Sequence, residues 1–154
     1  MALDPALAHI GAMSDIDAII QNFELLDDWE DRYRYLIELG RELEPLPESG
    51  HTEANKVRGC ASQVWLETQV SRPPGQPPRL AFRADSDAHI VRGLVRLVLS
   101  AYSGLPAPEI LGQDIAPIFA RLGLDSHLTP QRSNGVRSMV ERIKADARAA
   151  LANA

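Results

Sequence analysis

A proline-rich segment over residues 71–78 separates two stretches of β-forming residues, and it constrains the fold more than any other feature. Four of its eight residues are proline, and each proline removes a backbone donor, so the segment predicts a turn. Apolar residues alternate with other types before it, at Val64 and Leu66, and return after it at Leu80 and Phe82. This pattern predicts two antiparallel strands joined across the turn.

Helical spacing flanks the predicted hairpin on both sides. Before it, apolar residues recur at helical spacing over residues 14–43, where Ser14 and Asp17 predict a capping box and Asp27 with Asp28 marks a break. After it, we expect a helix from Asp87 to about Ser100, short helices at 108–111 and 115–122, and a final helix to about Ala152 that begins at Thr129 and Pro130.

Helices, then strands, then helices predict an α+β fold. With Val57 in a short additional strand, we expect a small antiparallel sheet of about three strands with helices packed on it. A chain of 154 residues is expected to form a single domain over 1–154. Residues 1–13 are expected to be a flexible N-terminal extension.

Composition excludes several classes of function. The formal net charge of −5 and the presence of only eight Phe, Trp and Tyr residues argue against a nucleic-acid partner. No apolar run approaches the length of a membrane span, and the N-terminus lacks the pattern of a secretory signal. Together with a single cysteine, these features predict a cytoplasmic protein without a membrane partner.

Cys60 is the only cysteine in the chain, so it cannot form an internal disulfide or contribute to a four-thiolate metal site. It follows Gly59, which favours a turn, and we expect it on a loop that enters the sheet. One interpretation is a buried structural cysteine, because free cysteine is among the most buried residue types. The other is a reactive thiol, whose pKa the neighbouring Arg58 could lower.

No general base and no metal site emerge from the spacing of the histidines. His9, His51, His89 and His127 are scattered along the chain, and an exposed or helix-surface position is the simpler interpretation of each. His51 precedes the cysteine in the sequence and could approach it. Because no His pair has a ligand spacing and only one thiol is present, the sequence predicts no metal site and no cofactor.

Two further segments have both a structural and a functional interpretation. The acidic stretch 85–88 predicts a helix cap, with a direct chemical role as the alternative. Near the start of the last helix, Arg132 is either a surface charge or a group that reaches the edge of the sheet. Gly135 costs about 1 kcal/mol relative to alanine inside a helix, so we expect close packing there.

Taken together, four ordered segments resemble the SufE family of sulfur acceptors. They are residues 29–40 (WEDRYRYLIELG), 57–65 (VRGCASQVW), 85–94 (DSDAHIVRGL) and 124–135 (LDSHLTPQRSNG). The resemblance covers nearly the whole chain after about residue 14. Ala61, where the family often has glutamine, and the long proline-rich turn are departures. The family's fold is similar to that of the IscU scaffold, with helices on a small antiparallel sheet.

The resemblance implies a sulfur-transfer function. Cys60 would take sulfur from the persulfide of a pyridoxal-phosphate-dependent cysteine desulfurase (SufS- or CsdA-like), stimulate that enzyme, and pass sulfur to an iron–sulfur cluster assembly scaffold. Such a protein acts as a co-catalyst through a persulfide intermediate. Arg132 matches a family arginine near the acceptor loop, and we expect it to support that loop or the persulfide.

Two alternatives remain beside the carrier. The first is a non-catalytic adaptor that binds a desulfurase or a downstream sulfur-using enzyme by its surface. The second, a scaffold that assembles the cluster itself, is disfavoured because one thiolate cannot hold a cluster by four cysteines. For the carrier we expect the Cys60 thiol to rest partly in an apolar pocket, where oxidation is less accessible, and to turn outward on docking.

Overall fold

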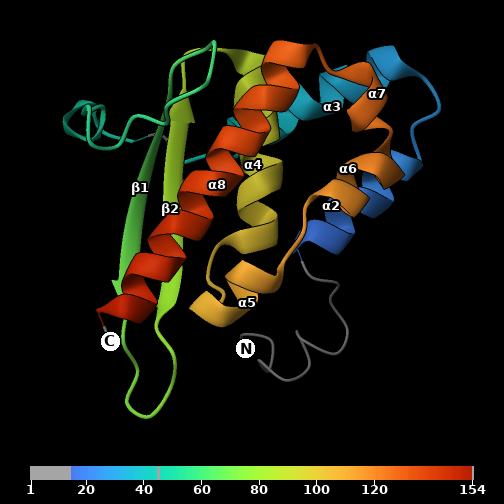
Figure 1. The fold of residues 1–154 in the computed structure, drawn as a ribbon. Helices are drawn as coiled ribbons and strands as arrows, with labels where there is room; N and C mark the ends of the chain where they lie inside the picture. Colours follow the sequence, from blue (N-terminus) through green and yellow to red (C-terminus); the bar gives the residue numbers. More distant parts are fainter. Residues whose placement is uncertain (1–14, 45, 154) are drawn as a thin grey trace, which may run out of the picture.

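The computed structural model describes residues 15–44 and 46–153. The elements, shown in Figure 1, are α2 (Asp15–Glu24), α3 (Trp29–Arg41), η1 (Glu48–Gly50), β1 (Val64–Ser71), β2 (Arg79–Ser86), α4 (His89–Tyr102), α5 (Ala107–Gly112), α6 (Ala116–Leu122), α7 (Leu124–His127) and α8 (Pro130–Ala152). The predicted extension over residues 1–13 and the capping box at Ser14 lie outside the described residues.

The predicted hairpin is confirmed. Strands β1 and β2 pair in antiparallel register from Val64 opposite Ser86 to Ser71 opposite Arg79, and the proline-rich segment forms the connection. The alternating residues Val64 and Leu66 are buried on one face of this hairpin, together with Leu80, Phe82 and Ala84. Figure 1 shows α8 running across the hairpin, with α4 beside it.

The α+β fold class is confirmed, but the sheet has two strands rather than about three. The segment before Cys60 pairs with β1 only briefly: Lys56 forms an isolated bridge with Trp65, and the Val57 amide donates to the Val64 carbonyl at 2.8 Å. Gly59 then adopts a left-handed conformation with φ of 89°. Because this turn takes the chain away from β1 after one bridge, Val57 does not extend into a strand.

Most predicted helices are present, with two differences. Asp28 caps α3 by accepting from the Glu30 amide at 3.0 Å, as the break at this position predicted. In α4, however, the N-cap residue is Ala88, and no side chain caps it, so the predicted start at Asp87 is wrong. The short helix α7 was not predicted, because four residues do not establish a helical period.

Helices α3 and α4 approach each other at a glycine. A Cβ atom at Gly93 of α4 would lie 2.0 Å from the carbonyl oxygen of Leu36 in α3. Only glycine permits this backbone approach. This close approach places α4 between α3 and strand β2 of the hairpin. In α4, Leu97 and Val98 are completely buried. No helix in the described part of the chain has the length and apolar character needed to cross a membrane.

Candidate functional site

The loop that carries Cys60, residues 58–63, precedes β1 and lies close to α8; it is called the Cys60 loop below. Gly59, immediately before the cysteine, has a positive φ, and a Cβ atom there would lie 2.4 Å from the Ser138 hydroxyl oxygen of α8. The backbone conformation therefore favours glycine at this position, and a Cβ atom would in addition require the Ser138 hydroxyl to move. As a result the following residue, Cys60, is held against α8 and lies on the loop that enters the sheet, as expected.

Asp87 fastens the other end of this loop. Its carboxylate accepts a hydrogen bond from the Gln63 amide at 3.1 Å, and its own amide donates to the Gln63 carbonyl at 3.4 Å. The side chain predicted to cap α4 thus binds the loop instead. The neighbouring Ser86 hydroxyl accepts from the Ala88 amide at 3.3 Å, so the acidic stretch serves the turn into α4 and the Cys60 loop together.

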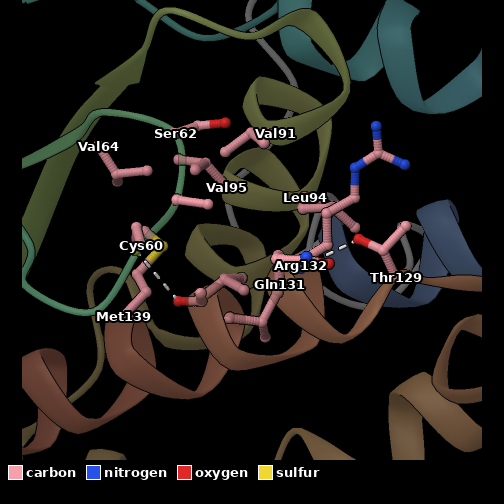
Figure 2. Close-up of a pocket in the computed structure, with 14 residues that line it drawn as sticks. Cys60, Ser62, Val64, Val91, Leu94, Val95, Thr129, Gln131, Arg132 and Met139 are labelled. Atoms are coloured by element: carbon pink, nitrogen blue, oxygen red, sulfur yellow. Dashed lines mark hydrogen bonds between the residues drawn. The ribbon is translucent and has the colours of Figure 1, made fainter.

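The Cys60 thiol is half-buried. Its Sγ lies 3.6 Å from the carbonyl oxygen of Gly135 in α8, a contact that Figure 2 marks with a dashed line. Burial raises the pKa of the Cys60 thiol, because desolvation disfavours the thiolate. Arg58 does not counteract this effect; its guanidinium is exposed and pairs with Glu53 at 3.2 Å. The thiol is therefore in its protonated form at neutral pH.

An apolar cavity of about 220 Å³ adjoins the thiol. Helices α4 and α8 supply its apolar wall, and Figure 2 shows these side chains around the Cys60 loop. The apolar residues lining it include Val91, Leu94, Val95, Val98, Val136 and Met139. Polar groups from Ser62, Thr129 and Gln131 complete the lining. The cavity can therefore shelter an uncharged sulfur-containing group, whereas an isolated anion inside it would be destabilised.

Arg132 also lines this cavity but does not contact the thiol. It lies in the first turn of α8, where the Thr129 hydroxyl caps the helix by accepting from the Arg132 amide at 3.3 Å. Its guanidinium points away from Cys60 in Figure 2. Among the described residues this guanidinium has no hydrogen-bond or ion-pair partner. Support of the loop or of a persulfide by Arg132 would require its side chain to move.

The histidines in the described part of the chain do not line the cavity. His51 is instead held by Asp85, with Nε2 and Oδ2 3.2 Å apart, and stacks on Trp65 with ring centroids separated by 4.1 Å. His127 stacks on Trp29, and His89 is exposed at the start of α4. His9 lies outside the described residues. None of the three described histidines is thus positioned as a general base for Cys60.

The groups around Cys60 limit the chemistry of the site. Besides the thiol, Arg132 is the only ionisable side chain among the described residues that line the cavity. No group of three or more His, Cys, Asp or Glu residues that could hold a metal ion occurs in the ranges described. The site therefore offers one potential sulfur nucleophile, the Cys60 thiol, which is partly shielded from solvent in this structure. Sequence reasoning identified this sulfur but missed Asp87 as the anchor of its loop.

The sequence matches the SufE family, described as the Fe-S metabolism associated domain, over residues 17–147. The protein therefore belongs to the SufE family, a family of sulfur-transfer proteins in iron–sulfur metabolism that interact with cysteine desulfurases. Among its relatives is an uncharacterized SufE-like protein of Rhizobium etli, which is 57% identical over 136 residues, covering 88% of this chain and 91% of the relative. A second uncharacterized SufE-like protein, from Rhizobium meliloti, is 53% identical over 135 residues, covering 88% of this chain and 96% of the relative.

A solved structure shares the fold. The solution structure of a hypothetical protein from Thermus thermophilus superposes with a TM-score of 0.67, covering 89% of this chain and 96% of the other. The two sequences are 23% identical. This likeness supports the arrangement of helices around the hairpin, and the family membership rests on the sequence comparisons.

Proposed function

We propose that this protein accepts sulfur on Cys60 from a pyridoxal-phosphate-dependent cysteine desulfurase, stimulates that enzyme, and passes the sulfur on to an iron–sulfur cluster scaffold. The observation that carries the proposal is the single thiol of a SufE-family chain, half-buried on a loop beside an apolar cavity. A reducing compartment such as the cytosol would keep this thiol free. The partner would be a desulfurase of the SufS or CsdA kind.

The transfer is an exchange between two sulfur centres. The Cys60 thiolate attacks the outer sulfur of the desulfurase persulfide, and a bond forms between Cys60 Sγ and that sulfur. The bond from the outer sulfur to the desulfurase cysteine breaks, and the departing thiolate takes up the proton that Cys60 loses. No net oxidation or reduction occurs, so no further reactant is required. With no second cysteine, the new persulfide cannot collapse into an internal disulfide.

Arg132 remains a proposed supporting residue. Its guanidinium is unpaired within the described residues, which leaves it available to approach the loop or the persulfide after the side chain moves. An Arg132→Gln variant, which lacks the positive charge, would remove Arg132 from this role if it acquires and transfers sulfur at the wild-type rate.

A Cys60→Ser substitution tests the carrier against the adaptor. For a carrier, incubation with a desulfurase and L-cysteine adds one or more sulfur atoms to the wild-type chain at residue 60, as measured by intact mass and peptide mapping. The Ser variant should gain none and should lose all stimulation of the desulfurase, while its Kd for the enzyme is retained because the docking surface is intact. Circular dichroism checks that both chains are folded.

The adaptor makes the opposite prediction. If the protein acts only by binding a desulfurase or a downstream enzyme, the Cys60→Ser variant stimulates as well as the wild type, and no sulfur is found on residue 60. That pair of results would overturn the carrier proposal.

A further inference from the structure

Gly135 occupies a position where a glycine is unfavourable for the helix that contains it. It lies inside α8, several residues after the Thr129 cap, and it is half-buried. Alanine is a better helix former at such a position, because glycine loses more backbone freedom on folding. A physical reason for the glycine must therefore be sought in its neighbours.

Packing in the thiol state does not require this glycine. At Gly93 a Cβ atom would lie 2.0 Å from the backbone carbonyl oxygen of Leu36, which excludes any side chain. A Cβ atom at Gly135 would instead lie 3.5 Å from Cys60 Sγ and 3.9 Å from its Cα and Cβ atoms, which is ordinary van der Waals contact. Alanine therefore fits beside Cys60 as long as the side chain ends at Sγ.

An additional sulfur changes this result. The outer sulfur of a persulfide lies about 2.0 Å beyond Sγ. Straight toward the Gly135 carbonyl, whose oxygen is 3.6 Å from Sγ, there is no room for it. The outer sulfur must then lie to one side of that line. Directions that point toward residue 135 are open beside glycine, whereas a methyl group there, only 3.5 Å from Sγ, would close them. The apolar cavity of about 220 Å³ begins at this point, between α4 and α8.

We propose that Gly135 is the size-determining residue of the Cys60 cavity, and that its missing side chain leaves the space in which the outer sulfur of a Cys60 persulfide is sheltered as the uncharged –S–SH group. The inference rests on the proposed function, since it concerns the same site in its loaded state. A methyl group at residue 135 is tolerated by the thiol and excludes the persulfide from the sheltered position. The loaded loop of such a variant is displaced toward solvent.

The test compares Gly135→Ala with the wild type in the thiol and persulfide states. Both full-length proteins are loaded with inorganic polysulfide. In this reaction the Cys60 thiolate bonds to one sulfur atom of the polysulfide and expels a shorter polysulfide. Dithiothreitol is then added, whose thiolate bonds to the outer sulfur and releases Cys60 as a thiolate. We expect the variant to lose its persulfide about tenfold faster by mass spectrometry, the effect of a modest overpacking penalty.

Two controls make the result specific. Iodoacetamide should alkylate the thiol state of both chains at the same rate, and Gly135→Ala should unfold at the same or a higher temperature. Gly112→Ala is the matched variant, since Gly112 ends α5 and a Cβ atom there meets nothing within 4 Å. It should lose its persulfide at the wild-type rate.

The failures of the two proposals are distinguishable. If the wild type takes no sulfur on Cys60 from polysulfide or from a desulfurase, the proposed function fails. If the wild type is loaded but Gly135→Ala loses sulfur at the same rate or more slowly, the role of Gly135 alone is overturned. Equal acceleration of thiol alkylation and persulfide loss would also overturn it, because the loop would then be opened in both states.

Discussion

For the Cys60 thiol, reactivity as a nucleophile and protection from oxidation make opposite demands in water. A nucleophilic cysteine reacts as the thiolate, yet an exposed thiolate is readily oxidised. Here burial beside the apolar cavity raises the pKa of the thiol, and the neighbouring Arg58 does not counteract that effect. The isolated protein therefore keeps its sulfur protonated and shielded. For the proposed sulfur transfer, the surroundings of the thiol would have to change when the donor binds.

Alkylation kinetics test this view of Cys60. Because its pKa is raised by burial, the thiolate fraction at neutral pH is smaller in the folded chain than in the unfolded one. The rate with iodoacetamide should therefore rise with pH through a higher midpoint in the folded chain than in urea. Coincident midpoints would show that the thiol is not desolvated.

The same experiment with a desulfurase present tests the outward turn of the loop. A catalytically inactive desulfurase, which carries no persulfide, should accelerate Cys60 alkylation if docking draws the thiol out of the cavity. If Cys60 is alkylated at the same rate with the desulfurase as without it, or more slowly, the outward turn of the loop is contradicted. Serum albumin at the same concentration controls for non-specific effects.

At the scale of elements, the Cys60 loop is held at its two ends by different means. At the entry, Gly59 lies against α8 near Ser138, and at the exit the Asp87 carboxylate accepts from the Gln63 amide. The contact at the exit is a hydrogen bond between a loop and the turn into α4. It can be broken without disturbing a helix, since α4 has no side-chain cap to lose.

An Asp87→Ala substitution should therefore loosen the loop. Loss of one solvent-exposed hydrogen bond worth about 1 kcal/mol predicts roughly fivefold faster alkylation of Cys60. Asp31→Ala is a suitable control, because Asp31 forms an exposed ion pair with Arg34 on α3, far along the chain from the loop. Alkylation of Asp87→Ala at the wild-type rate would show that the carboxylate does not restrain the loop.

At the scale of the whole molecule, Asp85 connects elements that are distant in sequence. It is 6% exposed and lies in β2. One of its oxygens accepts from the Arg92 guanidinium in α4, and the other pairs with His51 of the segment before Cys60. Arg92 also donates to the Gly40 carbonyl of α3 at 3.3 Å. This buried carboxylate therefore connects β2, α4 and the segment that precedes Cys60, and through Arg92 also α3. These connected elements form the frame on which the site is built.

Replacing Asp85 with asparagine should destabilise that frame. The substitution keeps the shape but leaves the Arg92 charge without its partner, for which a loss of about 3 kcal/mol in the free energy of unfolding is expected. Urea denaturation measures it, and Glu67→Gln provides a half-exposed comparison, since Glu67 pairs with Arg83 at 2.8 Å. That control should lose less than about 1 kcal/mol. Equal losses would contradict the central position of Asp85.

The sequence alone determined the elements whose signals are local. Alternation and prolines predicted the hairpin, Asp28 and Thr129 marked true helix starts, and Cys60 stood out as the only thiol. The motifs of four segments predicted the SufE family. Such features depend on backbone geometry and residue chemistry within a few positions, so the sequence suffices to predict them.

Tertiary structure decided the contacts between distant segments. Asp87 has the same local signature whether it caps α4 or binds Gln63, and the turn at Gly59 ended the expected third strand after one bridge. The sequence allowed His51 to approach Cys60, but in the structure its ring is held by Asp85. The reason is physical: hydrogen bonding, burial and space at one residue depend on which partners the fold brings to it, and local sequence does not specify those partners.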